Sequence, residues 1–296
     1  MTAIRAAATR RRGTSGSTRV AILQAGIVIL ILVAWEFLPR TLGIPRAFVV
    51  PLSESIAVGI REWGRIGPSL WPTISAMLIA LAATWVIGIA VGFLIGMSRS
   101  LVFLTRPLSM LYAVPFVIVY PLLSVWLGPG QLTKIVFAVG YGLIPVILTT
   151  ASGVRSVDDR LVRAAISMGA TRATLVRKVL LPASLPVVMS GLRLGGGLVI
   201  IAVIVAEMLA STSGGIGTLI TAYRVSLNAG AVYFCILIVL IIALAMDQSL
   251  SALERWVRRG DGTASPTSLS DGITVAAATG EMADEVSDVD APVLRS

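Results

Sequence analysis

The sequence contains few residues that could carry out catalysis. It has no histidine, which excludes Ser–His nucleophilic pairs, H-E-x-x-H zinc sites and haem ligation by histidine. Its single cysteine, Cys235, can form neither an internal disulfide nor a paired thiolate metal site, and we expect it to pack as a small apolar residue. No G-x-x-x-x-G-K-[ST] phosphate-binding loop is present. We therefore expect no catalytic residue, metal or cofactor, and any ATP hydrolysis must come from another protein.

A few residues inside apolar stretches are candidates for a transport pathway. Glu207 precedes the S-T-S-G-G-I-G segment at 211–217, and its carboxylate could line an outer mouth or bond to nearby backbone amides. Arg193 lies toward the other end of the same stretch, where snorkelling to the interface competes with solute contact. Pro115 and Pro121 interrupt another stretch, and the carbonyls they free could face a pathway or be satisfied by neighbouring helices.

A polar and basic segment at 158–182 separates two apolar stretches. Ser156, followed three residues later by Asp159, is a helix-start signal, and Gly169 suits a helix stop. Thr171 can cap a second helix that ends at Pro182. The segment thus predicts a short helix pair. The apolar positions of the first helix follow the i, i+3, i+4, i+7 pattern and are Leu161, Ala164, Ala165 and Met168.

The composition indicates a membrane protein. Hydrophobic residues make up 56% of the 296 residues and charged residues 13%, whereas an ordinary soluble domain carries roughly 25% charged residues. The net charge of +9 comes from Lys and Arg residues that are scattered through short loops rather than gathered on one soluble face. The basic residues therefore indicate orientation in a bilayer, and we expect no nucleic-acid partner.

Six apolar stretches are long enough, at about 20 residues, to cross the hydrocarbon core. Most basic residues fall on one side of a six-span layout, which by the positive-inside rule places both termini and the 153–183 loop in the cytoplasm. Lys134 is among the basic residues assigned to the outer side. The predicted spans of this all-α, polytopic protein are residues 20–38, 73–97, 101–127, 131–152, 184–211 and 230–250.

The two ends of the chain differ in composition from the predicted transmembrane domain at 20–259. Residues 1–19 and 260–296 are rich in Ala, Gly, Ser, Thr and charged residues without apolar periodicity, which predicts disordered tails. The second tail is acidic, and a solvated role is favoured over a regulatory one.

Prolines and glycines inside the predicted spans indicate breaks and close helix contacts. Pro107, Pro115 and Pro121 are expected to break the third span, and Pro145 the fourth. Glycines at every fourth residue allow two helices to approach closely, either within the chain or at a seam between two copies. These glycines are Gly88, Gly92, Gly96, Gly191 and Gly195.

Several short motifs accompany the 158–182 segment. They are A-A-x-x-x-G-A at 164–170 with L-P at 181–182, L-L-S-V-W-L-G at 122–128, G-V-R-S-V-D at 153–158, L-P-A-S-L-P at 181–186, G-L-R-L at 191–194 and A-E-M-L-A-S-T-S-G at 206–214. With them, the sequence from about Pro51 to Arg224 resembles the permease subunits of bacterial ATP-binding-cassette importers, in the branch that handles nitrate, sulfonates, taurine and related small molecules. The family carries Glu immediately before the two alanines, whereas this chain has Arg163.

The resemblance implies a type I importer permease in the bacterial inner membrane, in which the cytosolic helix pair docks in a groove of an ATPase. Its expected partners are two ATPase subunits, an extracytoplasmic solute-binding protein and a second permease copy that forms a homodimer. The residues expected to couple the permease to the ATPase are Asp158, Asp159, Leu161, Arg163, Ala164, Ala165, Met168, Gly169, Ala170, Leu181 and Pro182.

Two alternatives stay open at this point. The 158–182 segment could pack against the protein's own spans or lie at the lipid surface. The chain could also be a secondary transporter, although such a protein needs an ion or proton relay of several intramembrane carboxylates, and Glu207 alone gives little support for one.

Overall fold

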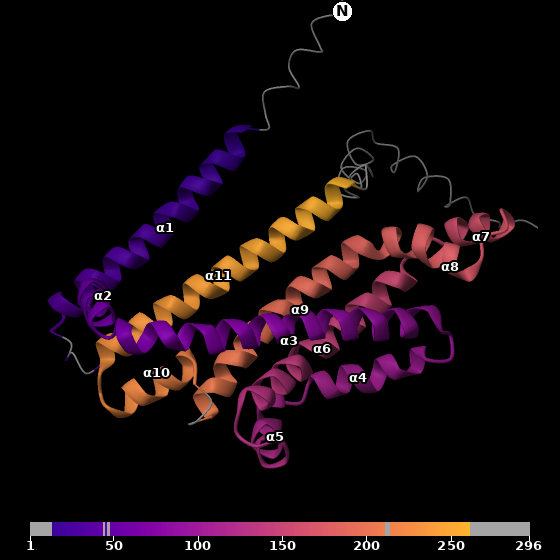
Figure 1. Cartoon of the computed structure of the whole chain (residues 1–296). Helices are drawn as coiled ribbons and strands as arrows, with labels where there is room; N and C mark the ends of the chain where they lie inside the picture. The colour runs from indigo at the N-terminus through magenta and orange to yellow at the C-terminus, as the bar shows by residue number, and fades with distance from the viewer. Residues whose placement is uncertain (1–13, 44, 46–47, 211–213, 261–296) are drawn as a thin grey trace, which may run out of the picture. The chain divides into compact units, whose positions relative to one another are not determined.

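The computed structural model describes residues 14–260 apart from 44, 46–47 and 211–213. Of the predicted tails at 1–19 and 260–296, residues 1–13 and 261–296 lie outside the described residues, whereas 14–19 belong to a helix and so does residue 260. The described part contains helices and no strands, which confirms the all-α prediction (Figure 1). The α-helices are α1 (Thr14–Thr41), α2 (Leu52–Arg61), α3 (Trp63–Met97), α4 (Thr105–Tyr112), α5 (Val119–Leu127), α6 (Gln131–Arg155), α7 (Asp159–Ser167), α8 (Arg172–Leu175), α9 (Leu181–Leu209), α10 (Ile216–Val225) and α11 (Ala229–Gly260). Short 3₁₀ segments cover Val102–Leu104 and Phe116–Ile118, and a π segment covers Val176–Leu180.

Five helices of the described chain are long and apolar enough to cross a membrane, and a bent pair brings the possible total to six. The bent pair consists of Val102–Tyr112 and Phe116–Leu127, whose axes differ by 78°. This pair covers the span predicted at 101–127, and its bend lies at Pro115, one of the prolines expected to break that span. The chain breaks just before Pro115, because proline lacks an N–H and disfavours helical backbone at the residue before it.

The other prolines do not break their helices. Pro121 is the third residue of α5 and Pro107 the third of α4, positions where the missing N–H would have no partner in the helix. The predicted break at Pro145 is wrong, since α6 runs on through this buried residue. Proline is tolerated inside a membrane-spanning helix because neighbouring helices and Ser or Thr side chains can satisfy the backbone groups that it frees.

The second cytosolic helix also continues where the sequence predicted an end. Residues Arg172–Leu209 form one continuous 38-residue helix, which includes α8, the π segment and α9. The prediction that Pro182 ends this helix is therefore wrong. The wider π turn at Val176–Leu180 ends two residues before the proline and makes room for its ring.

The core of the protein is formed by α3, α6 and α9, which pack along one another. Glycines of α3 and α9 face α6 in this core. A Cβ on Gly88 would lie 2.6 Å from Val146 Cγ1, and one on Gly92 would lie 2.9 Å from the Ile147 carbonyl oxygen. Gly195 contacts Val146 from the α9 side. The spaced glycines thus pack within the chain rather than at a seam between copies.

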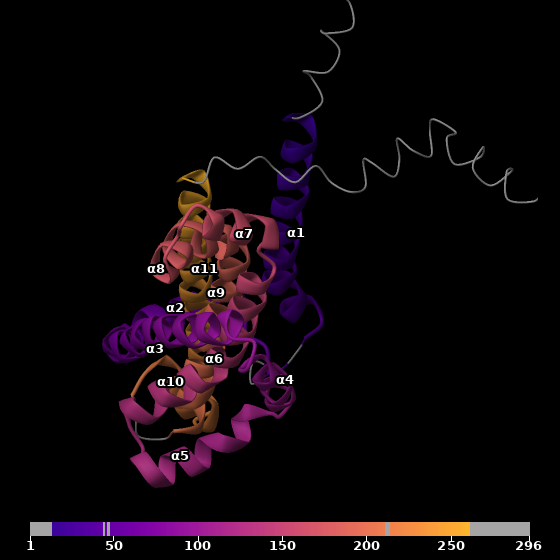
Figure 2. The ribbon, with the colours of Figure 1, turned by 90° about the vertical axis from the view of Figure 1, so that its right-hand side faces the viewer.

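Helix α1 is attached to the rest of the protein near its C-terminal end. The Trp35 indole N–H donates to the Val50 carbonyl oxygen at 3.0 Å, and Glu36 accepts a hydrogen bond from the Ser53 amide at 2.9 Å. Two views at right angles show α1 beside the other helices rather than among them (Figures 1 and 2). Large apolar side chains of α1, including Ile22 and Leu30, are exposed.

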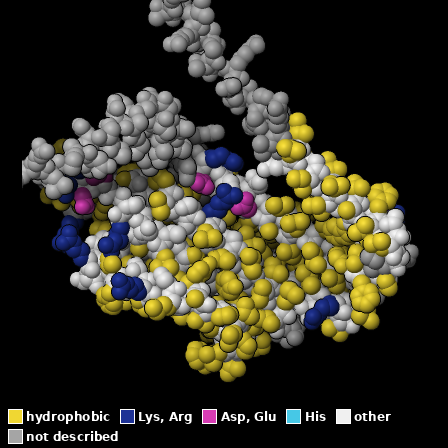
Figure 3. All heavy atoms as spheres, turned by 180° about the vertical axis from the view of Figure 1, so that it is seen from behind, with side chains coloured by type: hydrophobic (Ala, Val, Ile, Leu, Met, Phe, Trp, Pro, Cys, Tyr) yellow, Lys and Arg dark blue, Asp and Glu magenta, His cyan; other side chains and the backbone are white. Residues whose placement is uncertain are grey.

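Exposed apolar side chains also cover much of the remaining surface. On the face shown in Figure 3, hydrophobic side chains form a broad area with few Lys and Arg residues. Such an area on a helical protein fits contact with lipid tails. The chain is accordingly a multi-pass membrane protein.

Candidate functional site

The first candidate site is helix α7 and the turn that follows it, at the end of the core where α6 leads into α9. Asp158 is the N-cap of α7, and its carboxylate accepts a hydrogen bond from the Arg160 amide at 2.8 Å. Ser156, which the sequence analysis used as the start signal, instead donates its hydroxyl to the Gly153 carbonyl oxygen at 2.9 Å. The cap therefore lies two residues later than predicted.

A Schellman motif ends α7 at Gly169. The Ala170 amide donates to the Ala165 carbonyl oxygen at 3.0 Å, and the Gly169 amide donates to the Ile166 carbonyl oxygen at 2.9 Å. Gly169 has φ +79°, which glycine adopts without steric cost. Thr171 then caps α8 by accepting a hydrogen bond from the Thr174 amide.

One face of α7 is left uncovered by the chain itself. Leu161 is 54% exposed and Met168 82% exposed, and Ala164 lies between them on the same exposed face. Ala165 is buried and turns toward the protein's own helices. The apolar stripe of α7 therefore does not pack as a whole against the protein's own helices.

The other predicted coupling residues surround this face. Asp159 and Arg163 are exposed on α7, and Ala170 is half-buried in the turn. Leu181 and Pro182 are the first two residues of α9, with Leu181 exposed and Pro182 half-buried. The structure thus gathers the predicted residues at one end of the molecule, on α7, the turn after it and the beginning of α9.

The predicted pathway residues do not come together. Pro115 lines a cavity of about 280 Å³ at the break of the bent span, with Phe116 and Tyr141 beside it. Pro121 lies on the exposed surface of α5. Arg193 forms a two-point ion pair with Asp247 of α11, with both N···O distances 3.0 Å. This pair is about half exposed, so Arg193 is held by Asp247 rather than directed into a described cavity.

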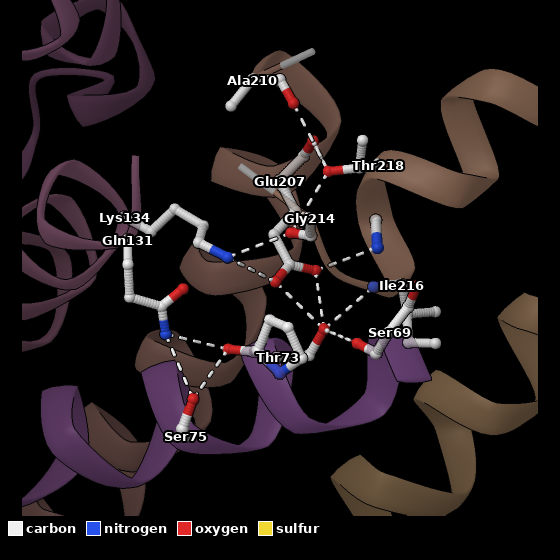
Figure 4. A network of polar contacts seen from close by, with 12 residues as sticks. Ser69, Thr73, Ser75, Gln131, Lys134, Glu207, Ala210, Gly214, Ile216 and Thr218 are labelled. Carbon is white, nitrogen blue, oxygen red and sulfur yellow. Dashed lines mark hydrogen bonds and ion pairs between the residues drawn. The ribbon is translucent and has the colours of Figure 1, made fainter. Parts of the chain in front are cut away.

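Glu207 lies at the opposite end of α9 from α7 and is completely buried. Its carboxylate accepts a hydrogen bond from the ammonium group of Lys134 of α6 at 3.0 Å, and Lys134 is also completely buried (Figure 4). The Lys134 ammonium group donates a second bond to the Gly214 carbonyl oxygen at 3.1 Å. The pair therefore joins α6, α9 and the turn before α10.

The same carboxylate caps helix α10. Glu207 Oε2 accepts a hydrogen bond from the Gly217 amide at 3.0 Å, and the Thr73 hydroxyl of α3 accepts one from the Ile216 amide at 2.9 Å. Thr73 in turn donates to Glu207 at 3.0 Å. The first two amides of α10 are thus satisfied by side chains of two other helices, because the N-cap residue, Gly215, has no side chain.

Gly215 is required at this position for two reasons. Its φ of +116° and ψ of 170° lie in a backbone region used almost only by glycine. A Cβ on this residue would also collide with the Glu207 carboxylate. The charge of Glu207 is balanced by Lys134 and by the partial positive charge at the N-terminus of α10.

Sequence reasoning missed the role of Lys134, which it only counted among the basic residues on the outer side. The residue falls three and four positions before the buried residues Phe137 and Ala138, so it lies on the inward face of α6. That spacing was the available signal. Its partners could not be identified from it, because Glu207 lies 73 residues further along the chain.

Comparison with known proteins decides what kind of membrane protein this is. Residues 86–259, more than half of the chain, match the family model described as "Binding-protein-dependent transport system inner membrane component". This chain belongs to that family. The match starts within α3 and includes α7, the turn at Gly169 and the Lys134–Glu207 pair.

Alignments with related proteins extend over most of this chain. The taurine transport system permease protein TauC of Escherichia coli is 30% identical over 246 residues, 80% of this chain and 89% of TauC. The riboflavin transport system permease protein RibX of Chloroflexus aurantiacus is 29% identical over 242 residues, 80% of this chain and 89% of RibX. Two crystal forms of the MetNI methionine ABC transporter in inward-facing conformations share the fold, with TM-scores of 0.58 and 0.56. They are 21% identical to this chain and cover 67% and 63% of it, and 98% and 93% of their own chains.

The chain is therefore a transmembrane permease of a binding-protein-dependent importer. Within the described residues, nothing supports the alternative of a secondary transporter. Glu207 is paired with Lys134 and the α10 amides rather than with further carboxylates, so no relay of acidic groups surrounds it.

Proposed function

We propose that this permease works with two ATPase subunits, an extracytoplasmic solute-binding protein and a second, identical permease. The exposed face of α7 is the observation that carries this proposal, because an apolar face between two capped turns suits docking against another protein. The permease would open outward to receive solute when the ATPases close on ATP, and inward when they separate. The coupling residues are those of the 158–182 segment predicted from the sequence.

The proposed orientation places α7, α8 and both termini in the cytoplasm. It is supported by the basic residues from Arg155 to Lys178 and by those that flank the first and last spans. The end that contains Glu207 and α10 would then face the outside. The protein would reside in the bacterial inner membrane.

The continuous helix from Arg172 to Leu209 supports a direct mechanical role for the cytosolic helix pair. The turn at Gly169 connects α7 to the beginning of this helix. A displacement of α7 by an ATPase would therefore act on a membrane-spanning helix without an intervening loop beyond that turn.

The solute is proposed to be a small molecule of the sulfonate, nitrate or taurine class, or another small organic molecule. TauC and RibX are about equally similar to this chain, yet their names refer to taurine and to riboflavin. Overall identity therefore does not distinguish between these solutes. The ligand of the partner binding protein is the measurement that identifies the solute.

Reconstitution in proteoliposomes tests the proposed function. We expect the purified permease to hydrolyse no ATP, and solute uptake to require the ATPase, ATP and the loaded binding protein together. An ionophore that collapses ion gradients should leave this uptake unchanged. ATP hydrolysis by the permease alone, or uptake that follows an ion gradient without ATP, would contradict the proposal.

A further inference from the structure

One continuous helix connects the two ends of the permease. The 38 residues of Arg172–Leu209 span about 57 Å at 1.5 Å per residue. The helix begins beside α7 and ends next to α10, and Figure 1 shows these two helices at opposite ends of it. No loop interrupts the chain between Arg172 and Glu207.

Near its C-terminal end, at Leu209, this helix is bonded to three other helices. Glu207 is bonded to Lys134 of α6, to Thr73 of α3 and to the Gly217 amide of α10 (Figure 4). The Gln131 side chain adds a bond from α6 to the Pro72 carbonyl oxygen of α3 at 3.1 Å. All four helices are therefore joined by polar bonds in a small region.

Further contacts hold α10 directly against α9. The Thr218 hydroxyl lies 3.1 Å from the Glu207 carbonyl oxygen, and the Thr221 hydroxyl lies 3.3 Å from the Met208 carbonyl oxygen. A Cβ on Gly217 would lie 2.7 Å from the Ile204 carbonyl oxygen, so the two backbones touch at this point. Separating α10 from α9 would break these bonds as well as the bond from the Gly217 amide to the Glu207 carboxylate.

The burial of both charges makes this connection a rigid one. Lys134 and Glu207 have no exposed surface, and a buried charge that loses its partner has neither water nor a counter-charge. An exposed pair such as Arg193–Asp247 can be replaced by water at little cost. The helices that meet at Glu207 are thus expected to move together.

We propose that Lys134 and Glu207 are positioning residues of the transport cycle, whose buried ion pair fuses the outer ends of α3, α6, α9 and α10 into one body. A displacement of the cytosolic helix pair then reaches α10 through α9, and α10 is the outer element that the ATPase moves. This inference rests on the proposed function, since it assumes that an ATPase displaces α7.

A charge-free double variant tests the role of the pair. In Lys134→Met with Glu207→Gln, no unpaired charge is buried, and the new amide oxygen can still accept from Gly217. We expect normal membrane insertion and normal binding of the ATPase, because α7 lies at the other end. Transport per ATP should fall about five-fold or more, the size of a typical coupling between sites. Transport per ATP equal to that of the wild type would overturn the proposal.

A cross-link between α9 and α10 separates rigid positioning from a latch that opens. Met208→Cys and Thr221→Cys, made in a chain with Cys235→Ala, place a thiol on each helix where they touch. We expect a disulfide or a short thiol cross-linker to form equally without nucleotide and with ATP trapped, and to leave wild-type transport unchanged. The same variant with its thiols reduced is the control.

Each remaining outcome contradicts a particular statement. Loss of transport on cross-linking the wild-type pair, with recovery on reduction, would mean that the connection opens and would overturn the proposal. Cross-linking that fails in both states, or in one state only, would do the same. If the double variant does not insert, the cross-link in the wild-type background decides alone. A wild-type complex without ATP-driven uptake would refute the proposed function instead.

Discussion

The two ends of the permease core are capped in opposite ways. At the α7 end, Asp158 and Thr171 cap the helices that directly follow them, and Gly169 forms the turn between these helices. At the α10 end, the cap comes from Glu207 of α9 and Thr73 of α3. A helix that is capped locally needs little from the rest of the fold. Helix α7 can therefore leave one face open for a partner. The N-terminus of α10, in contrast, is capped only when α3 and α9 are packed beside it.

The largest expected effect concerns the buried charge at the α10 end. Lys134→Met leaves the Glu207 carboxylate without its counter-charge, and breaking a buried pair in this way costs about 3–5 kcal/mol. We expect a corresponding loss in the free energy of unfolding, measured by denaturation in detergent. Lys178→Met is the matched control, because Lys178 is exposed beside α8 and its replacement should change stability by less than about 0.5 kcal/mol. Equal effects of the two substitutions would remove the distinction between the ends.

Glycines at the two ends sharpen the comparison. Gly215→Ala meets both an unfavourable backbone conformation and the Glu207 carboxylate, so we expect a loss of about 2–4 kcal/mol. Gly169→Ala meets the conformational cost alone, about 1–2 kcal/mol, since nothing lies within 4 Å of the new Cβ. Thermal unfolding of both variants, measured in the same detergent, gives the difference. A greater loss at Gly169 would contradict the view that its turn is free of tertiary contacts.

This contrast also explains how much of the structure could be predicted from the sequence. The helix pair at 158–182 was predictable because Gly169 and Thr171 act on residues within one turn of themselves. The helical class and the apolar stretches were also predictable, because both depend on residues that are close together in the sequence. The network at α10 was not, because Thr73 and Glu207 are 134 residues apart and their pairing depends on how α3 and α9 pack.

The prolines show the same limit. Each of Pro115, Pro145 and Pro182 carries the same local signal for a helix end, yet the helix ends only at the first. Pro145 is buried among neighbouring helices, and Pro182 follows a π turn that accommodates its ring. Neither circumstance can be recognised from the residues next to the proline.

A smaller effect is expected from the charge at position 163, where the resemblance noted in the sequence analysis leads us to expect Glu instead of Arg. Arg163 is exposed on α7, so a cation there predicts an acidic or neutral partner surface. Arg163→Glu should weaken binding of the ATPase about ten-fold or more, which corresponds to about 1.4 kcal/mol. Arg163→Gln should have a smaller effect, because it removes the attraction without adding repulsion.

The measurement for Arg163 is the dissociation constant of the ATPase at low and high salt. The difference between the wild type and Arg163→Glu should shrink at high salt, as screening weakens contacts between partly exposed charges. Unchanged affinity at both salt concentrations would show that this side chain points into water. The open face of α7 would then bind its partner through apolar contacts such as Leu161 and Met168 alone.

The smallest effect tests a turn that the two ends have in common. α10 also ends in a Schellman motif, in which the Asn228 amide donates to the Tyr223 carbonyl oxygen at 2.9 Å. The left-handed position is occupied by Leu227, with φ 56°, and this residue is 77% exposed.

Asn tolerates this conformation better than Leu, so Leu227→Asn should raise the free energy of unfolding by about 0.5–1 kcal/mol. Gly169→Asn, the matched change in the turn after α7, should lower it slightly. A loss of stability in Leu227→Asn would mean that the leucine side chain, which lines a cavity with Phe48 and Tyr233, contributes more to stability than its backbone conformation costs. In that case this turn too would depend on tertiary contacts, as the N-terminus of α10 does.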